Sequence, residues 1–361
     1  MTDIYVMNKN FEDVAVIDTF DSFIWTNRYN RPGDFELALA KTPEHRAALK
    51  ADYYLRIAGE PNVMIVETIE PDTDSDTNFV VRGRDLSSII DRRVTQYAWY
   101  TGSIQTAILE MLKWSIVQPS NTYRTISNFR YETSTDSSLT GLTMSGNIEF
   151  IGKNVLEQIN AWADEYKFGY RTYLDSNNNF VFRLYIGDNR SYNQTVNPFV
   201  VFSPEFDNIK STQYLEDYSK WKNVVLISGE GDASNTTLTW LGLDAPSGLY
   251  RREFHYSSDK TSVTGQDEDG EDIHMSVQDY DYILKNDARP ELYKQTVTKI
   301  YDGEVDLTRL YAYNVDFSVG DIVQFVTDDG EEFRCRIVEF TRSWDESGFE
   351  AYPVFEVEKE Q

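Results

Sequence analysis

The side chains that most often do chemistry are sparse and scattered in this chain. Its three histidines, His45, His255 and His274, are far apart in sequence and share no spacing typical of metal ligands. Gly229-Glu-Gly231 follows an expected strand, but Ser234 stands where the third glycine of a dinucleotide-binding loop would be. No Gly-Lys-Ser/Thr loop for phosphate is present either. A catalytic triad assembled in space stays open, because its members need not be close in sequence.

An acidic run, Asp267-Glu-Asp-Gly-Glu-Asp272, has the composition of a calcium-binding loop but not its spacing. Aligning Gly270 with the invariant glycine of that loop places Gly265 at the first ligand position and Ser276 at the last, where carboxylates are required. A solvated loop over Gly265–Asp272 is therefore the better interpretation, with weak cation binding left open. Paired carboxylates for glycoside hydrolysis cannot be singled out among 60 acidic residues.

The single cysteine, Cys335, excludes an internal disulfide and a cage of thiolate metal ligands. It lies in the alternating segment Phe333–Ile337, which places its side chain on the apolar side of a strand, where free cysteine packs as a small hydrophobic residue. These residues together indicate no catalytic, cofactor-binding or metal-ligating position. We therefore predict that the chain is not an enzyme and holds no cofactor.

Charge and composition narrow the class of protein. The 361 residues include 60 acidic and 34 basic side chains, a net charge of -26. Binding to phosphates needs Lys and Arg, so this balance disfavours a nucleic-acid-binding role, although solubility alone would explain the charge. The N-terminus lacks the pattern of a signal peptide, and no apolar run approaches the roughly 18 residues of a membrane span. We expect a soluble protein made in the cytoplasm.

Alternating apolar and polar residues predict short strands through the first 85 residues, a pattern typical of sandwiches and barrels. The strongest stretches are Asp13–Phe20, Ser22–Tyr29, Phe35–Leu39, Tyr53–Ala58, Val63–Ile69 and Asn78–Gly83. Strands return at Tyr170–Leu174, Phe180–Ile186, Trp221–Ser228 and Thr236–Leu241, and again from Tyr311. In that last segment Asp328-Asp329-Gly330 reads as a turn.

Helical periodicity occurs in the middle of the chain. Ser103 is placed to cap one helix, and Asn154 with Glu157 resembles a capping box for a second, which Gly169 is placed to end. Two shorter helices are predicted at Ser276–Asn286 and Pro290–Thr298, because proline disfavours a helical conformation in the residue before it.

These elements predict a mostly β, α+β fold with two β-barrel-like domains and inserted helical or mixed domains. We expect an N-terminal β-barrel-like domain at 1–100 and a mixed α/β insertion at 101–215. Strands at 216–275 would continue the second barrel region, and short helices with a C-terminal β-barrel-like domain would occupy 276–361.

Four groups of residues, in this order along the chain, carry a family resemblance. They are Phe23–Tyr29 with Pro32–Leu37, then Gly83–Leu86 with Ile89-Ile90 and Arg92-Arg93, then Lys222–Val225 with Gly229–Gly231 and Gly248–Glu253, and finally Tyr313–Phe317 with Val319–Val323. No single group is specific, but the ordered set resembles the tail-hub or tail-associated proteins of siphophages, which are related in fold to the baseplate hubs of contractile tails.

The resemblance implies a homotrimeric tail-tip hub in the virion, assembled in the host cytoplasm. Two barrel-like domains per chain would form a ring with quasi-sixfold symmetry, placed between the sixfold distal tail protein and the threefold tip. The tape measure protein and receptor-binding or tip proteins would be further partners. DNA would pass through the ring without specific binding, favoured by an acidic wall. The chain stops soon after its last barrel-like segment, so we expect no fibre and no peptidoglycan-cleaving domain.

Arg84, Arg92 and Arg93 form an unusual basic cluster in an acidic protein. On a short helix they could pair with acidic groups of a neighbouring subunit, which makes them candidate interface residues. Pairing within the chain, with Asp85 and Asp91, is an equal alternative. Gly83, like Gly320, is expected at a strand-to-turn junction, where the missing Cβ lets the chain bend.

Two other functions remain as alternatives. A carbohydrate-binding or cell-wall-degrading virion protein would use exposed aromatic side chains and paired carboxylates, although Tyr and Trp spread through strands usually belong to the core. A cell-surface adhesin is disfavoured by the missing signal peptide.

Overall fold

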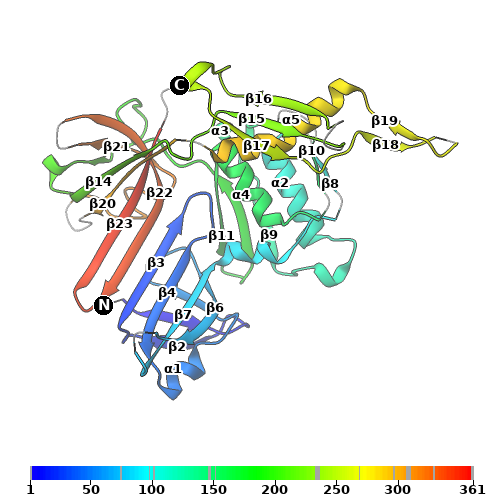
Figure 1. Cartoon of the computed structure of the whole chain (residues 1–361). Coiled ribbons are helices and arrows are strands. Elements are labelled where there is room, and N and C mark those ends of the chain that lie inside the picture. Colours follow the sequence, from blue (N-terminus) through cyan, green and yellow to red (C-terminus); the bar gives the residue numbers. More distant parts are fainter. Residues whose placement is uncertain are drawn as a thin grey trace. The chain divides into compact units, whose positions relative to one another are not determined.

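The computed structural model describes residues 2–73, 75–96, 98–100, 102–144, 148–150, 152–231, 236–267, 269–295, 297–305, 310–327 and 330–358 (Figure 1). The chain divides into two compact units. Unit 1 comprises Met1–Tyr214 and Ile300–Gln361, and unit 2 comprises Leu215–Lys299. The four-segment division predicted from the sequence stays a prediction, which limited proteolysis would test.

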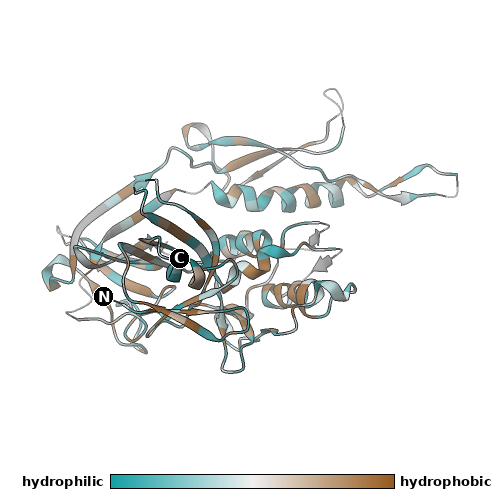
Figure 2. Cartoon of the chain, turned by 90° about the horizontal axis from the view of Figure 1, so that it is seen from below, coloured by the Kyte–Doolittle hydropathy of each residue, from teal (hydrophilic) through white to brown (hydrophobic). Residues whose placement is uncertain are grey.

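One large sheet runs through unit 1, and its main path follows the order β14-β20-β23-β22-β3-β4-β7-β6-β5-β1-β2. Its strands are β1 (Ile4–Met7), β2 (Asp13–Ile17), β3 (Ser22–Arg28), β4 (Asp34–Ala40), β5 (Tyr54–Ile57), β6 (Met64–Pro71), β7 (Asn78–Asp85), β14 (Ile209–Asp217), β20 (Thr298–Val305), β22 (Glu332–Asp345) and β23 (Gly348–Val357). Strands β13 (Val201–Phe202) and β21 (Ile322–Val326) branch from β22. Figure 2 shows hydrophobic and hydrophilic residues alternating along strands, as expected where one face is buried.

The two ends of the chain meet in this sheet, where β3 pairs with β22 in antiparallel register from Arg28 opposite Glu339 to Ser22 opposite Asp345 (Figure 1). Each half has its own core. The N-terminal core includes Ile4, Trp25, Leu37 and Val81, and the C-terminal core includes Phe202, Val323, Phe340 and Phe355. The predicted mostly β fold is confirmed. Its two barrel-like regions are halves of one open sheet, since the described strands close no barrel.

Helices and two small sheets form the remainder of unit 1. The elements are α1 (Pro43–Ala48), η1 (Leu86–Arg92), β8 (Ala98–Tyr100), α2 (Ile104–Leu112), η2 (Lys113–Val117), η3 (Thr122–Arg124), β9 (Phe129–Tyr131), α3 (Ser137–Thr140), β10 (Ile148–Phe150), α4 (Val155–Tyr166), β11 (Gly169–Leu174), β12 (Phe180–Tyr185) and η4 (Pro204–Phe206). Helices α2 and α4 bury Ile108, Met111, Ile159 and Trp162 in a core that also holds Phe182 of β12. Strands β11, β12 and β9 form a three-stranded sheet in that order.

Of the predicted helix caps, one is confirmed, one lacks its side-chain hydrogen bond and one is wrong. Asn154 accepts a hydrogen bond from the Glu157 amide at 3.1 Å, as a capping residue should. Ser103 occupies the N-cap position of α2 without a side-chain capping bond. The prediction for Gly169 is wrong, because Lys167 takes the left-handed conformation that ends α4. Gly169 begins β11 instead, and a Cβ there would lie 2.2 Å from the Tyr29 ring.

The prediction of a bend is correct for one of the two glycines and wrong for the other. Gly320 has φ of +101 and lies at the turn before β21, as predicted. Gly83 lies inside β7, opposite Phe35 of β4 and Val66 of β6. A β-bulge interrupts the β6–β7 register just beyond Val66, and such bulges bring backbones close together. Gly83 therefore permits close strand contact rather than a bend.

Unit 2 packs one helix on a three-stranded sheet. The sheet has the order β16 (Leu238–Gly242), β15 (Val224–Ser228) and β17 (Glu253–Ser257), and none of these strands joins the large sheet. Val225 and Ile227 pack against Tyr280, Leu284 and Leu292 of helix α5 (Val277–Lys294). The remaining elements are the turn η5 (Gly248–Tyr250) and a hairpin of β18 (Val263–Gln266) and β19 (Asp272–His274).

The two predicted short helices are one helix, α5, with Pro290 in its interior. Proline costs helix stability because it removes a hydrogen bond and crowds the preceding turn. Ala288 and Leu292 on either side of it are both fully buried in the core of unit 2. Tertiary packing on both sides of the proline therefore outweighs the local preference.

Cys335 lies in β22 within the C-terminal core, as its alternating neighbours predicted. Burial raises the pKa of its thiol, which depletes the reactive thiolate. We expect the native protein not to react with a maleimide or disulfide reagent at pH 8, and to consume one equivalent after unfolding in urea. Native labelling as fast as that of a free thiol would contradict this placement.

Candidate interface site

The three arginines singled out in the sequence lie along one short stretch of unit 1. Arg84 is near the end of β7, Arg92 ends the 3-10 helix η1, and Arg93 is its C-cap. Asp85 positions this stretch, because its carboxylate accepts hydrogen bonds from the amides of Gly33 at 2.7 Å and Ser87 at 2.8 Å. Asp85 thus caps η1 rather than pairing with an arginine.

Asp85 gives this region a pH dependence. Burial raises the pKa of Asp85 from 3.8 to about 6, so the folded chain holds this proton more tightly than the unfolded chain. The stability that this proton contributes is fully present below pH 3.8 and is lost as the pH rises through about 6. Relative to wild type, an Asp85→Asn variant should gain about 2 kcal/mol of unfolding free energy between pH 4 and pH 7. Urea titrations at both pH values measure this, and a pH-independent difference would contradict it.

Arg84 is fully engaged within its own chain. Its Nε and Nη2 donate to the Glu67 carboxylate at 2.8 and 2.9 Å, and its Nη1 donates to Asp91 at 3.0 Å. Hydrogen bonding to Glu67 raises the pKa of Arg84. Asp91 also accepts from the Asn154 amide at 2.9 Å, which links β7 to the start of α4. The intrachain alternative therefore describes the contacts of Arg84.

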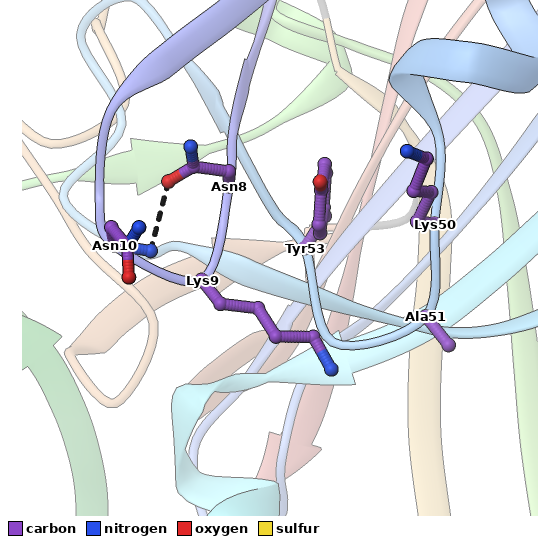
Figure 3. Close-up of a pocket in the computed structure, with 6 residues that line it drawn as sticks. All are labelled: Asn8, Lys9, Asn10, Lys50, Ala51 and Tyr53. Atoms are coloured by element: carbon purple, nitrogen blue, oxygen red, sulfur yellow. Dashed lines mark hydrogen bonds between the residues drawn. The ribbon is translucent and has the colours of Figure 1, made fainter.

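Arg92 reaches a carboxylate that it shares with a lysine. Asp52 accepts from Arg92 and from Lys9, each at 3.0 Å, and the hydrogen bond from Lys9 lowers the pKa of Asp52. A hollow of about 490 Å³ adjoins Lys9, and the Lys50 ammonium lies 5.8 Å from the centre of the Tyr53 ring. The hollow is lined by Asn8, Lys9, Asn10, Lys50, Ala51 and Tyr53 (Figure 3). The lining of this hollow combines two lysines, two asparagine side chains and one tyrosine, with no carboxylate, serine or cysteine among them.

Arg93 differs from the other two arginines, because no described carboxylate pairs with it. Its Nε donates to the Arg124 carbonyl at 3.0 Å, and its Nη1 donates to the Arg92 carbonyl at 2.9 Å. Burial lowers the pKa of Arg93, and the charges of Arg124 and Arg92 lower it further. Arg124 donates to the Val94 carbonyl, while its Nη1 is buried without a described partner.

Arg92, Arg93 and Arg124 are the arginine cluster of this chain. The sequence indicated two of its members but not Arg124, which lies in η3 and is brought there only by the fold. No local pattern around Arg124 distinguishes it from other surface arginines. Arg93 and Arg124 are held in place by carbonyl oxygens, so their positive charges are oriented but not neutralised by a described carboxylate, whereas Arg92 pairs with Asp52.

The contacts of two of the histidines, within the described part of the chain, do not have the order of a hydrolytic triad. Ser262 Oγ lies 2.6 Å from His274 Nδ1, and the same hydroxyl donates to Glu230. In a triad the carboxylate orients the histidine, whereas here the serine lies between the two. His255 Nε2 bonds to Ser228 at 2.9 Å with no carboxylate in that pair. Over the described ranges, no three His, Cys, Asp or Glu side chains gather closely enough to hold a metal.

The acidic run is the tip of the β18–β19 hairpin, with Glu268 outside the described residues. One Asp267 oxygen accepts from the amides of Asp269 at 2.9 Å and Glu271 at 3.0 Å, so it shapes the turn. The turn predicted at Asp328-Asp329-Gly330 and the third-glycine position, Ser234, likewise fall on undescribed residues, except for Gly330. Among the helices that are described, none has the length and hydropathy to cross a membrane.

Comparison with known proteins identifies the fold. The tail protein of Neisseria meningitidis MC58 superposes with a TM-score of 0.56 and 10% identity, over 98% of this chain and 96% of that one. The 43 kDa tail protein of prophage MuSo2 from Shewanella oneidensis gives 0.57 and 12%, over 99% and 98%. Prophage tail protein gp18 from Listeria monocytogenes EGD-e gives 0.50 and 15%, over 98% and 94%. At these identities the similarity shows a shared fold.

Sequence comparison places the chain in a family. No curated protein matches it. The family model described as Siphovirus ReqiPepy6 Gp37-like protein matches residues 3–355, which span all four groups of residues that carried the resemblance. The expected relationship to siphophage tail proteins is thereby confirmed. This chain belongs to the family of Siphovirus ReqiPepy6 Gp37-like proteins.

Proposed function

We propose that this chain is a structural protein of a siphophage tail tip, in which three copies form a hub ring around the DNA exit channel. The ring would link the sixfold distal tail protein to a threefold tip. The family match over residues 3–355 carries the proposal, and the fold shared with phage tail proteins supports it. The tape measure protein and the receptor-binding or tip proteins would be neighbours in the virion, after assembly in the host cytoplasm.

The architecture of unit 1 suits a ring. Each chain supplies two sheet halves with separate cores, joined through β3 and β22. Three copies would supply six such halves, so the same ring could face a sixfold partner on one side and a threefold partner on the other. A net charge of -26 would limit sticking of DNA in the channel, because like charges repel. The proposed role requires no bond-making chemistry.

Light scattering on the purified protein, alone and with the distal tail protein, tests the proposal. We expect particles that contain three copies of the 41.8 kDa chain in at least one of the two conditions. A chain that remains at its monomer mass in both conditions would overturn the trimeric hub.

The alternative of carbohydrate binding depends on exposed aromatic side chains. Trp240 on β16 is partly exposed, but the Arg251 guanidinium lies 4.8 Å from the centre of its ring. Trp221 is covered in the same way by Arg252 at 5.0 Å. Stacking with arginine occupies a ring face that a sugar would need, which favours the structural role.

A further inference from the structure

The β18–β19 hairpin, residues 263–274, is the arm of unit 2, and it extends away from α5 and the three-stranded sheet (Figure 1). Its base is fixed, because the Met275 amide donates to the Ser262 carbonyl at 2.8 Å. Beyond the base every described side chain from Thr264 to His274 is exposed. An isolated two-stranded hairpin is only marginally stable in water, so an arm of this kind gains order from a partner.

The chemistry of the arm is acidic with one apolar side chain. Asp267, Asp269, Glu271 and Asp272 make no ion pair with a described cation. Ile273 is 48% exposed, and its cross-strand neighbour is a glycine, Gly265, which leaves its face uncovered. The arm therefore complements a surface that carries positive charge and a few exposed apolar side chains.

The arginine cluster of unit 1 has that complementary chemistry. Arg93 and Arg124 lack described carboxylate partners and repel each other. Arg124 donates to the Val94 carbonyl, which orients its guanidinium without neutralising it, so a carboxylate from a second copy would supply the missing negative charge. Beside the two guanidinium groups, Val94 is 50% exposed and Tyr123 is 97% exposed.

We propose that the arm of one copy docks on the arginine cluster of a second copy, its carboxylates on Arg93 and Arg124 and Ile273 against Val94 and Tyr123. This inference rests on the proposed ring. A contact between two different surfaces of identical chains is head-to-tail, and in a closed ring each arm and each cluster is used once. Because the chain carries a net charge of -26, copies repel each other in general, and a specific positive patch offsets that repulsion.

Charge exchange tests the contact, measured by light scattering under the condition in which the wild-type chain assembles. Arg93→Glu with Arg124→Glu should weaken association by about tenfold or more, and so should Asp269→Lys with Asp272→Lys on the arm. The chain with all four changes should regain association, because the attraction is restored with its sign exchanged. A matched control reverses two exposed acids elsewhere, Asp3→Lys with Glu346→Lys, and should associate as well as wild type.

Cross-linking separates contact between copies from contact within one chain. In a Cys335→Ser background, Arg93→Cys and Asp269→Cys chains are mixed with a short bis-maleimide, and we expect a covalent heterodimer. A chain that carries both cysteines is tested in parallel. If only this chain cross-links, and its product has the mass of a monomer, docking between copies is refuted. If the variants of the arm assemble as well as the wild-type chain, docking of the arm is refuted, but the proposed hub ring is not. A wild-type chain that never assembles would overturn both.

Discussion

Replacing Arg342 with methionine is expected to lower the free energy of unfolding by about 3 to 5 kcal/mol. Arg342 of β22 forms a salt bridge with Glu60, whose side chain is fully buried. Asn27 of β3 also donates to Glu60, at 3.1 Å, and the Asn62 amide donates at 3.0 Å. Methionine would fill similar space but leave the Glu60 charge buried with amide donors alone. Urea unfolding followed by circular dichroism measures the loss.

The control for Arg342→Met also removes the charge of Glu60. In the double variant Glu60→Gln with Arg342→Met the amide oxygen can still accept from Asn27 or from the Asn62 backbone, and no charge remains unpaired. It should recover most of the loss, because replacing a whole buried pair costs far less than breaking it. A single variant within about 1 kcal/mol of wild type would contradict the burial of this ion pair.

Gly83→Ala is expected to be nearly as damaging as Arg342→Met. A Cβ on Gly83 would lie 1.7 Å from the Ile65 carbonyl oxygen and 2.9 Å from the Phe35 ring. The ring could move, but the carbonyl belongs to the β6 backbone, so β6 and β7 would have to separate beside the bulge. We expect a loss of about 3 kcal/mol or more, measured as a lower urea midpoint.

A matched glycine on another strand provides the control for Gly83→Ala. No atom lies within 4 Å of a Cβ built on Gly265 of β18, and its φ is not left-handed. Gly265→Ala should therefore leave the urea midpoint unchanged or slightly raised, since alanine restricts the unfolded chain. If the two alanine variants had the same midpoint, the close approach of β6 and β7 would be refuted.

Local patterns in the sequence predict the elements of this fold better than their arrangement. Phe35, Leu37 and Leu39 alternate with polar or small residues, and all three are buried in β4. The cap at Asn154 could also be predicted from the sequence, because capping depends on neighbours within one helical turn. The α5 prediction failed where burial of Ala288 and Leu292 outweighed the cost of Pro290.

Pairing partners far apart in sequence leave no such pattern. The periodicity of β3 and of β22 predicts two strands but does not show that they are neighbours. The same limit applies to the arginine cluster. Arg93 was singled out by its adjacent arginine, whereas Arg124 enters through a hydrogen bond formed only after folding. The sequence also could not show that Arg84 is neutralised by Glu67, 17 residues away.

The β3–β22 seam has a consequence for how the protein is made. Thr26 and Thr341 meet across it, 315 residues apart, so the N-terminal strands emerge from the ribosome long before their partner exists. Until then β3 presents an open edge, and exposed edges recruit other chains. Closing so distant a contact late in synthesis makes folding slow. The yield of folded protein should therefore rise with added chaperones and at lower temperature, and should respond less to the rate of translation.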